Sequence, residues 1–101
     1  MRVMIIYPQR GRIIRRDIEG SLADLQHLVD GYIETWAPPE LLEEGITLIC
    51  NEEGLLKGLP VNENLEPFFL VGVIVAVGIE NDYFVGLTER QEERLLYWLA
   101  H

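Results

Sequence analysis

The chain has 101 residues, of which 49% are hydrophobic and 25% are charged, and its formal net charge is −9. This length allows one domain, and the apolar content is too high for a disordered chain. Its apolar runs are shorter than the roughly 18 residues that a membrane span needs, and its start lacks the features of a secretory signal. Together these features predict one acidic domain in the cytoplasm.

Basic residues are concentrated at the start of the chain. Five of the eight precede the first acidic residue, and they are Arg2, Arg10, Arg12, Arg15 and Arg16. The rest of the chain is too acidic to form the broad basic surface of a duplex-binding protein, which excludes duplex nucleic acid as a partner. Guanidinium groups bind phosphate bidentately, so the cluster could instead hold the phosphates of a small ligand. The alternative is that these arginines pair with acids elsewhere in the fold.

Two strands and a helix are predicted in the first third of the chain. Aliphatic side chains favour strands over residues 2–7 and 12–18, with a turn between them. Ser21 is a good N-cap, and leucines and a valine follow it at helical spacing. Gly31 is typical of a helix end, so we expect this helix to stop there.

The middle of the chain alternates short strands with turns. Two prolines break it after Trp36, and Asn-Glu-Glu-Gly is typical of a hairpin turn. The predicted elements are strands over residues 32–36 and 46–50, a helical turn over 40–44, a returning hairpin arm over 55–58 and an irregular loop over 60–67.

The last third contains the most apolar segment and a second helix. Residues 68–77 carry seven β-branched or aromatic side chains, which predicts a central strand. A short strand over residues 83–87 follows, and Thr88 with Gln91 forms a capping box before a helix over residues 89–100. The whole pattern predicts a single α+β domain over residues 1–101, with a small antiparallel or mixed sheet and two helices packed on one face.

No catalytic or metal-binding motif stands out. The chain has two histidines, of which His27 falls on the exposed face of the predicted helix, and its single cysteine, Cys50, ends a buried strand. A catalytic triad needs a nucleophile, a base and a group that orients the base, and these residues do not supply one. We therefore expect no enzyme; the alternative is a hydrolase that uses a pair of carboxylates, since the chain has 17 acids. Adjacent glutamates point apart and do not chelate by themselves, and cofactor motifs are missing, so we expect neither a metal nor a cofactor.

One candidate binding site lies on the predicted strand over residues 32–36. Alternation places Tyr32, Glu34 and Trp36 on one face. Aromatic faces can stack on a nucleotide base, and a carboxylate can accept hydrogen bonds from ribose or amino groups. The alternative is that the two aromatic rings only cover a helix.

A second candidate site is the loop over residues 51–62. Asn51, Lys57 and Asn62 lie there among glycines that allow close backbone approach to a ligand. The amides could read the edge of a base while the ammonium group meets a phosphate, although turn chemistry explains several of the same residues. Binding residues are often carried on loops, which makes this segment the leading candidate.

Two segments resemble a known family. EGSLADLQHLVDGYIE (residues 19–34) and NEEGLLKGLPVN (residues 51–62) resemble a small uncharacterised domain of phages, plasmids and other mobile elements. The opening VMIIYP and the later FVGLTERQEE fit the same family, so the resemblance covers most of the chain. It brings no enzyme activity with it, and its setting implies a protein that opposes host defence.

Two functions follow from the resemblance as expectations. The first is a homo-oligomer that sequesters a small nucleotide-derived immune signal without cleaving it. The asparagines and Lys57 would position this signal, Tyr32 and Trp36 would stack on it, and Arg12, Arg15 or Arg16 would meet its phosphates. The second is an acidic inhibitor that binds a host defence protein directly.

Overall fold

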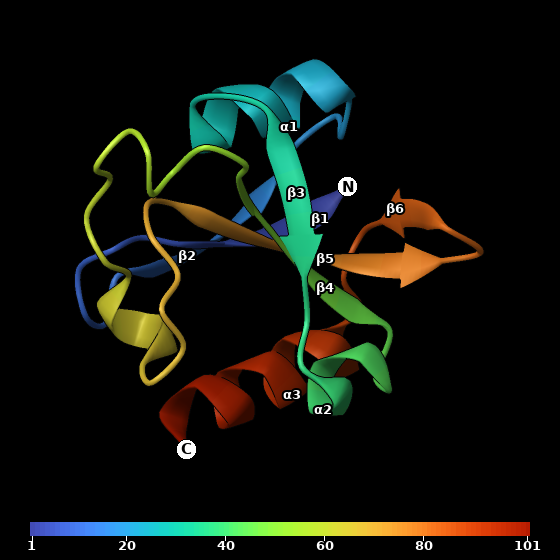
Figure 1. The fold of residues 1–101 in the computed structure, drawn as a ribbon. Coiled ribbons are helices and arrows are strands. Elements are labelled where there is room, and N and C mark those ends of the chain that lie inside the picture. Colours follow the sequence, from blue (N-terminus) through green and yellow to red (C-terminus); the bar gives the residue numbers. More distant parts are fainter.

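The computed structural model describes residues 1–101 and shows a six-stranded antiparallel sheet with helices on both faces (Figure 1). The strand order is β2-β1-β5-β4-β3, and β6 pairs with β5. The α+β class and the antiparallel sheet are therefore confirmed. The strands are β1 Arg2–Ile6, β2 Ile13–Asp17, β3 Ile33–Trp36, β4 Ile46–Asn51, β5 Ile74–Glu80 and β6 Tyr83–Val85; the helices are α1 Leu22–Val29, α2 Pro39–Leu42, the 3-10 turn η1 Glu63–Leu65 and α3 Glu89–Ala100.

Two apolar cores lie on opposite faces of the sheet. In β5, Ile74 and Ala76 face the core under α3, whereas Val75 and Val77 face the core under α1. The expectation of helices on one face is therefore wrong. Because β1, β4 and β5 carry apolar side chains on both faces, each face needs its own cover. No helix of the chain combines the length and apolar character that crossing a membrane requires.

Helix caps agree with the local sequence. The side chains of Ser21 and Thr88 each accept a hydrogen bond from the third residue of their helix, and both capping boxes are complete. At the end of α1, however, Asp30 adopts the left-handed conformation (φ 62°) and caps a helix that ends at Val29, so the cap lies one residue before the predicted Gly31. A Cβ on Gly31 would lie 2.7 Å from Asn51 Nδ2, so this glycine is needed for space.

Two segments differ from the predicted elements. Residues 55–58 form turns instead of a returning arm, and β5 begins at Ile74, so residues 68–73 are an irregular loop. This loop leaves the sheet because Val71 pairs with Val61, and Gly72 donates to Pro60 O at 2.7 Å. Phe68 and Phe69 are therefore exposed at the surface, whereas Val71 is buried and Leu70 and Val73 pack against the two cores.

Candidate functional site

Two hollows open beside the irregular loop over residues 68–71. Hollow 1, about 460 Å³, lies between α2, α3 and the turn around Glu66, and Phe68 lines it. Hollow 2, about 320 Å³, lies between β3, β4 and the turns over residues 52–56, and Phe69 lines it. Both reach the core under α3, through Leu65 in hollow 1 and Cys50 in hollow 2. Phe68 and Phe69, which are adjacent in the chain, thus line two different hollows.

Acidic side chains predominate around both hollows. Six of the 17 acids but only one of the eight basic residues line them, which leaves a formal charge of −5 when His101 is neutral. In hollow 1, Glu44 pairs with Arg94 at 3.2 Å and Glu66 pairs with Arg10 at 3.4 Å. The carboxylates of hollow 2 take part in no ion pair, and they are Glu34, Glu52 and Glu53. Hollow 2 is therefore the more strongly negative of the two in its immediate surroundings.

Exposed apolar side chains accompany these carboxylates. Leu55 and Phe69 are 66% and 69% exposed, and Leu56 is 88% exposed. Turn formation does not require large apolar residues, and exposing them side by side gains nothing for folding. Two adjacent leucines in a glycine-flanked loop are the sequence signal for this exposed apolar surface.

The predicted aromatic site is not assembled. The ring of Trp36 packs 4.9 Å from that of Phe68, which in turn stacks 5.7 Å from Trp98. Tyr32 lies just before β3 and is 65% exposed. Trp36 therefore belongs to an aromatic row above the core, and it does not form a stacking platform with Tyr32.

The two asparagines of the loop hold backbone segments together. Asn51 Nδ2 donates to Val29 O and Asp30 O, each at 3.0 Å, while its Oδ1 accepts from the amide of Glu53. Asn62 is completely buried and uses its amide in the same way. Neither side-chain amide is free to read a ligand, although Asn51 lies in the wall of hollow 2.

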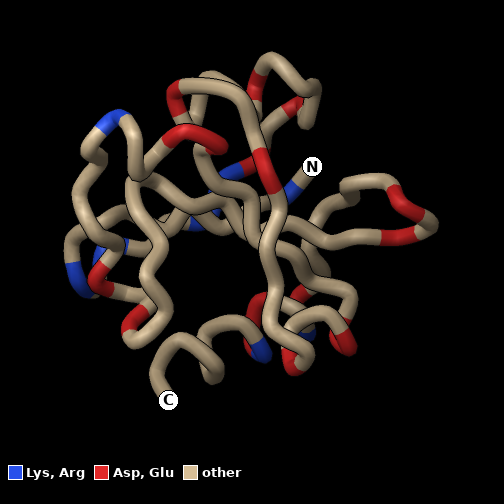
Figure 2. The backbone as a smooth tube through the Cα atoms, in the orientation of Figure 1, with Lys and Arg blue, Asp and Glu red and all other residues tan.

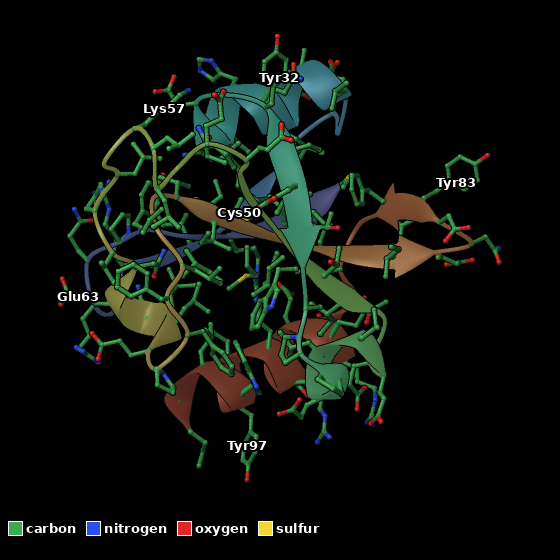
Figure 3. All side chains as sticks on the ribbon, viewed as in Figure 1. Tyr32, Cys50, Lys57, Glu63, Tyr83 and Tyr97 are labelled. Carbon is green, nitrogen blue, oxygen red and sulfur yellow. The ribbon has the colours of Figure 1, made fainter.

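The predicted basic residues do not converge on one point. Lys57 Nζ donates to Asp30 O at 3.2 Å, on the same side of the molecule as Tyr32 (Figure 3). The guanidinium group of Arg12 lies 4.0 Å above the ring of Tyr7, and Arg15 pairs with Glu92 at 2.8 Å. Arg16 lines a third hollow on the α1 face. The basic residues that were expected to bind phosphate together are therefore separated. Arg15 lies on the α3 face of the sheet, Arg16 lies on the α1 face, and Arg12 lies in the turn between β1 and β2.

The comparison with protein families identifies the chain. Residues 1–100 match a family described as a domain of unknown function, DUF3846. The chain is a member of the DUF3846 family. No curated protein and no solved structure matches it. The expected membership of an uncharacterised domain family is thus confirmed. In this DUF3846 chain, no three His, Cys, Asp or Glu side chains gather where they could hold a metal ion.

The thiol of Cys50 in this DUF3846 domain has a raised pKa. Burial, the charge of Glu34 and a hydrogen bond to Glu34 raise the pKa of its thiol from 9.0 to about 11. Its Sγ lies 3.8 Å from Glu34 Oε1. Only a small fraction of Cys50 is therefore in the thiolate form at neutral pH. Cys50 lines hollow 2 but is a poor nucleophile, because the thiolate is the reactive form.

We expect folded Cys50 to react with iodoacetamide at pH 8 at least about tenfold more slowly than a small free thiol, because the thiolate is the reactive form. Between pH 9 and 11 the unfolded chain releases the thiol proton while the folded chain keeps it. The free energy of unfolding therefore falls as the pH rises through this interval, and below pH 9 this group contributes no pH dependence. Mass spectrometry and denaturant titration measure the two effects.

Cys50→Ala is the control, because it removes the thiol and leaves every other titratable group in place. The decrease in the free energy of unfolding that is due to Cys50 is the difference between the pH profiles of the original chain and of Cys50→Ala. Equal pH profiles for the original chain and Cys50→Ala, or rapid alkylation of the folded chain, would contradict the assignment.

Proposed function

We propose that this chain is a non-catalytic binding protein that docks onto a basic, partly apolar surface of another protein. Hollow 2 carries the proposal. It combines three carboxylates that have no ion-pair partner with three large apolar side chains that are largely exposed to water. A ligand rich in phosphate would be repelled there, whereas lysine or arginine side chains would be attracted.

The arrangement is typical of a protein interface. Burying Leu55, Leu56 and Phe69 would supply affinity, because removing apolar area from water is favourable. The surrounding carboxylates would select basic partners and accelerate the encounter. Hollow 1, with its aromatic wall of Phe68 and Trp98, extends the same acidic surface. In a phage-infected cell, the partner would be a cytoplasmic protein of the host defence system.

We expect charge reversal at hollow 2 to weaken partner binding at least tenfold. The variant Glu52→Lys/Glu53→Lys places two positive charges against the basic partner, and Leu55→Ser/Leu56→Ser removes the apolar contact. Immobilised original chain is exposed to lysate of a bacterial host, and the proteins retained are compared with those retained by each variant. The partner so identified is then purified and its Kd is measured directly.

The matched control is Glu80→Lys/Glu93→Lys, which changes the net charge equally at exposed residues outside both hollows. Binding that the control loses equally would show a non-specific effect of net charge. Binding that both hollow-2 variants retain would contradict the proposal.

The sequestration of a nucleotide-derived signal is the second candidate. Its specific support is that Lys57 Nζ packs against the backbone at Asp30 and Gly31, directly before the exposed Tyr32. A screen by thermal shift with cyclic dinucleotides, cyclic oligonucleotides and ADP-ribose derivatives tests it. A stabilisation that Tyr32→Ala or Lys57→Ala abolishes, with the ligand recovered intact, would favour sequestration over docking.

A further inference from the structure

The sheet ends on both sides in an unpaired strand, β2 on one side and β3 on the other. Unpaired edge strands expose a row of backbone donors and acceptors, and they can pair with strands of other molecules. The two edges of this sheet differ in charge, and the difference is complementary.

The ladders show which backbone groups are free at each edge. Tyr7 donates to Arg12 O and Ile18 donates to Met1 O, so even-numbered residues of β2 face β1. The N–H and C=O groups of Ile13, Arg15 and Asp17 consequently point outward. At the other edge, Glu52 donates to Tyr32 O, so Glu34 faces β4 while the N–H and C=O groups of Ile33 and Thr35 point outward. No other backbone hydrogen bond occupies these outward groups.

The side chains beside these groups carry opposite charges. β2 presents the exposed Arg15 and Arg16 and one exposed acid, Asp17, whose carboxylate lies 3.9 Å from Arg2 Nε. The exposed Arg12 precedes the strand, so the edge is basic on balance. Arg15 uses only its Nε toward Glu92, which leaves its two terminal nitrogens available. β3 presents the exposed Glu34, and its partner β4 leads into Glu52 and Glu53. Figure 2 shows basic residues along the first two strands and acidic residues on and beside β3.

We propose that β3 of one copy of this chain pairs with β2 of a second copy, so that the sheet continues from molecule to molecule. Neighbouring strands are antiparallel throughout the order β2-β1-β5-β4-β3, which makes β2 and β3 run in the same direction. A second copy in the same orientation therefore offers β2 parallel to β3. This pairing rests on the backbone groups and charges of the two sheet edges and does not depend on the proposed docking function, although Glu34 lies both on the β3 edge and in hollow 2.

One register satisfies both the hydrogen bonds and the side chains. With Ile33 opposite Ile14, the outward groups of Ile33 meet those of Ile13 and Arg15. In the same register, Glu34 lies opposite Arg15 on the α3 face of the sheet. Ile14, which is 37% exposed, would meet Ile33 on the α1 face. The pairing thus covers apolar surface on one face and joins opposite charges on the other.

Symmetric alternatives are less favourable. Two β3 edges would bring their glutamates together, and two β2 edges would bring their arginines together, which costs energy in either case. The β3–β2 contact joins two different surfaces, so each added copy leaves one free edge of each kind. The expected product is an open, head-to-tail series of copies that dissociates on dilution and at high salt.

Two proline variants test the pairing, because proline removes the outward N–H and its ring obstructs an approaching strand. Thr35→Pro blocks the β3 edge, and Asp17→Pro blocks the β2 edge. In sedimentation equilibrium, the original chain should show an average mass that rises with concentration, whereas each variant alone should associate at least about tenfold more weakly. An equimolar mixture of the two variants should form a 1:1 dimer that grows no further, because each supplies the edge that the other lacks.

Thr35→Val and Asp17→Asn keep the N–H groups and serve as matched controls, which should associate like the original chain. Circular dichroism and Tm check that each proline variant is folded. Three results would overturn the proposal: an original chain that stays monomeric at the highest soluble concentration, a closed dimer that survives in one proline variant, or a mixture of the variants that stays monomeric. None of these substitutions alters hollow 2 or its carboxylates.

Discussion

Asn62→Ala should lower the free energy of unfolding by about 4 kcal/mol, a large part of the total stability of a domain of this size. Asn62 Nδ2 donates to Ile6 O at 3.0 Å and to Gly72 O at 2.9 Å, and its Oδ1 accepts from the amide of Asn64 at 3.1 Å. Removing the amide leaves two buried carbonyls without their donor. Denaturant titration followed by circular dichroism measures the loss.

The matched control is Glu63→Ala, since the adjacent Glu63 is exposed and should change stability by no more than about 0.5 kcal/mol. If Asn62 contacted a ligand instead, Asn62→Ala would leave stability intact and weaken ligand binding. A near-neutral effect on unfolding would therefore contradict the structural role.

Glu92→Ala should lower the free energy of unfolding by about 3 kcal/mol. The Glu92 residue is 2% exposed; its Oε2 lies 2.8 Å from Arg15 Nε, and its Oε1 lies 3.6 Å from Arg2 Nη1. The carboxylate joins α3 to β1 and β2. The side chain of Arg15 is 61% exposed, so salt should screen part of this contribution.

Glu93→Ala is the control, because Glu93 is exposed on the same helix and should give an effect within about 0.5 kcal/mol. A double-mutant cycle with Arg15→Ala then isolates the pair. Additive effects of the two substitutions would mean that the Glu92–Arg15 pair contributes nothing, and that Glu92 acts through its packing and through Arg2.

Two of the three carboxylates of hollow 2 belong to a segment that the sequence predicts to be a hairpin turn, and they are Glu52 and Glu53. Sequence reasoning weighs Glu52 and Glu53 as a metal pair and includes them in the candidate loop over residues 51–62, but it assigns the leucines after them to a returning arm. The segment forms turns because Gly54 packs against Val71, whose Cγ2 would lie 2.7 Å from a Cβ at residue 54. A contact between residues so far apart in the chain leaves no local pattern.

Asn51 and Asn62 are a second case in which contacts between distant segments decide the role of a residue. Asn51 and Asn62 were attractive as ligand contacts because they lie among glycines in a loop. Their partners, Val29 O, Asp30 O, Ile6 O and Gly72 O, come from distant segments. Sequence reasoning could recognise polar residues in a loop, but it could not show that the backbone already occupied them.

The sequence by itself determined the α+β class, the strong central strands and the caps of α1 and α3, because these depend on neighbouring residues and on periodicity. Only the tertiary structure decided which face each helix covers, that Glu92 is a buried partner of Arg2 and Arg15, and that the free carboxylates gather at hollow 2. Those outcomes depend on contacts between segments that are distant in the chain. Such contacts form only when the strands assemble into one sheet and both faces of that sheet are covered.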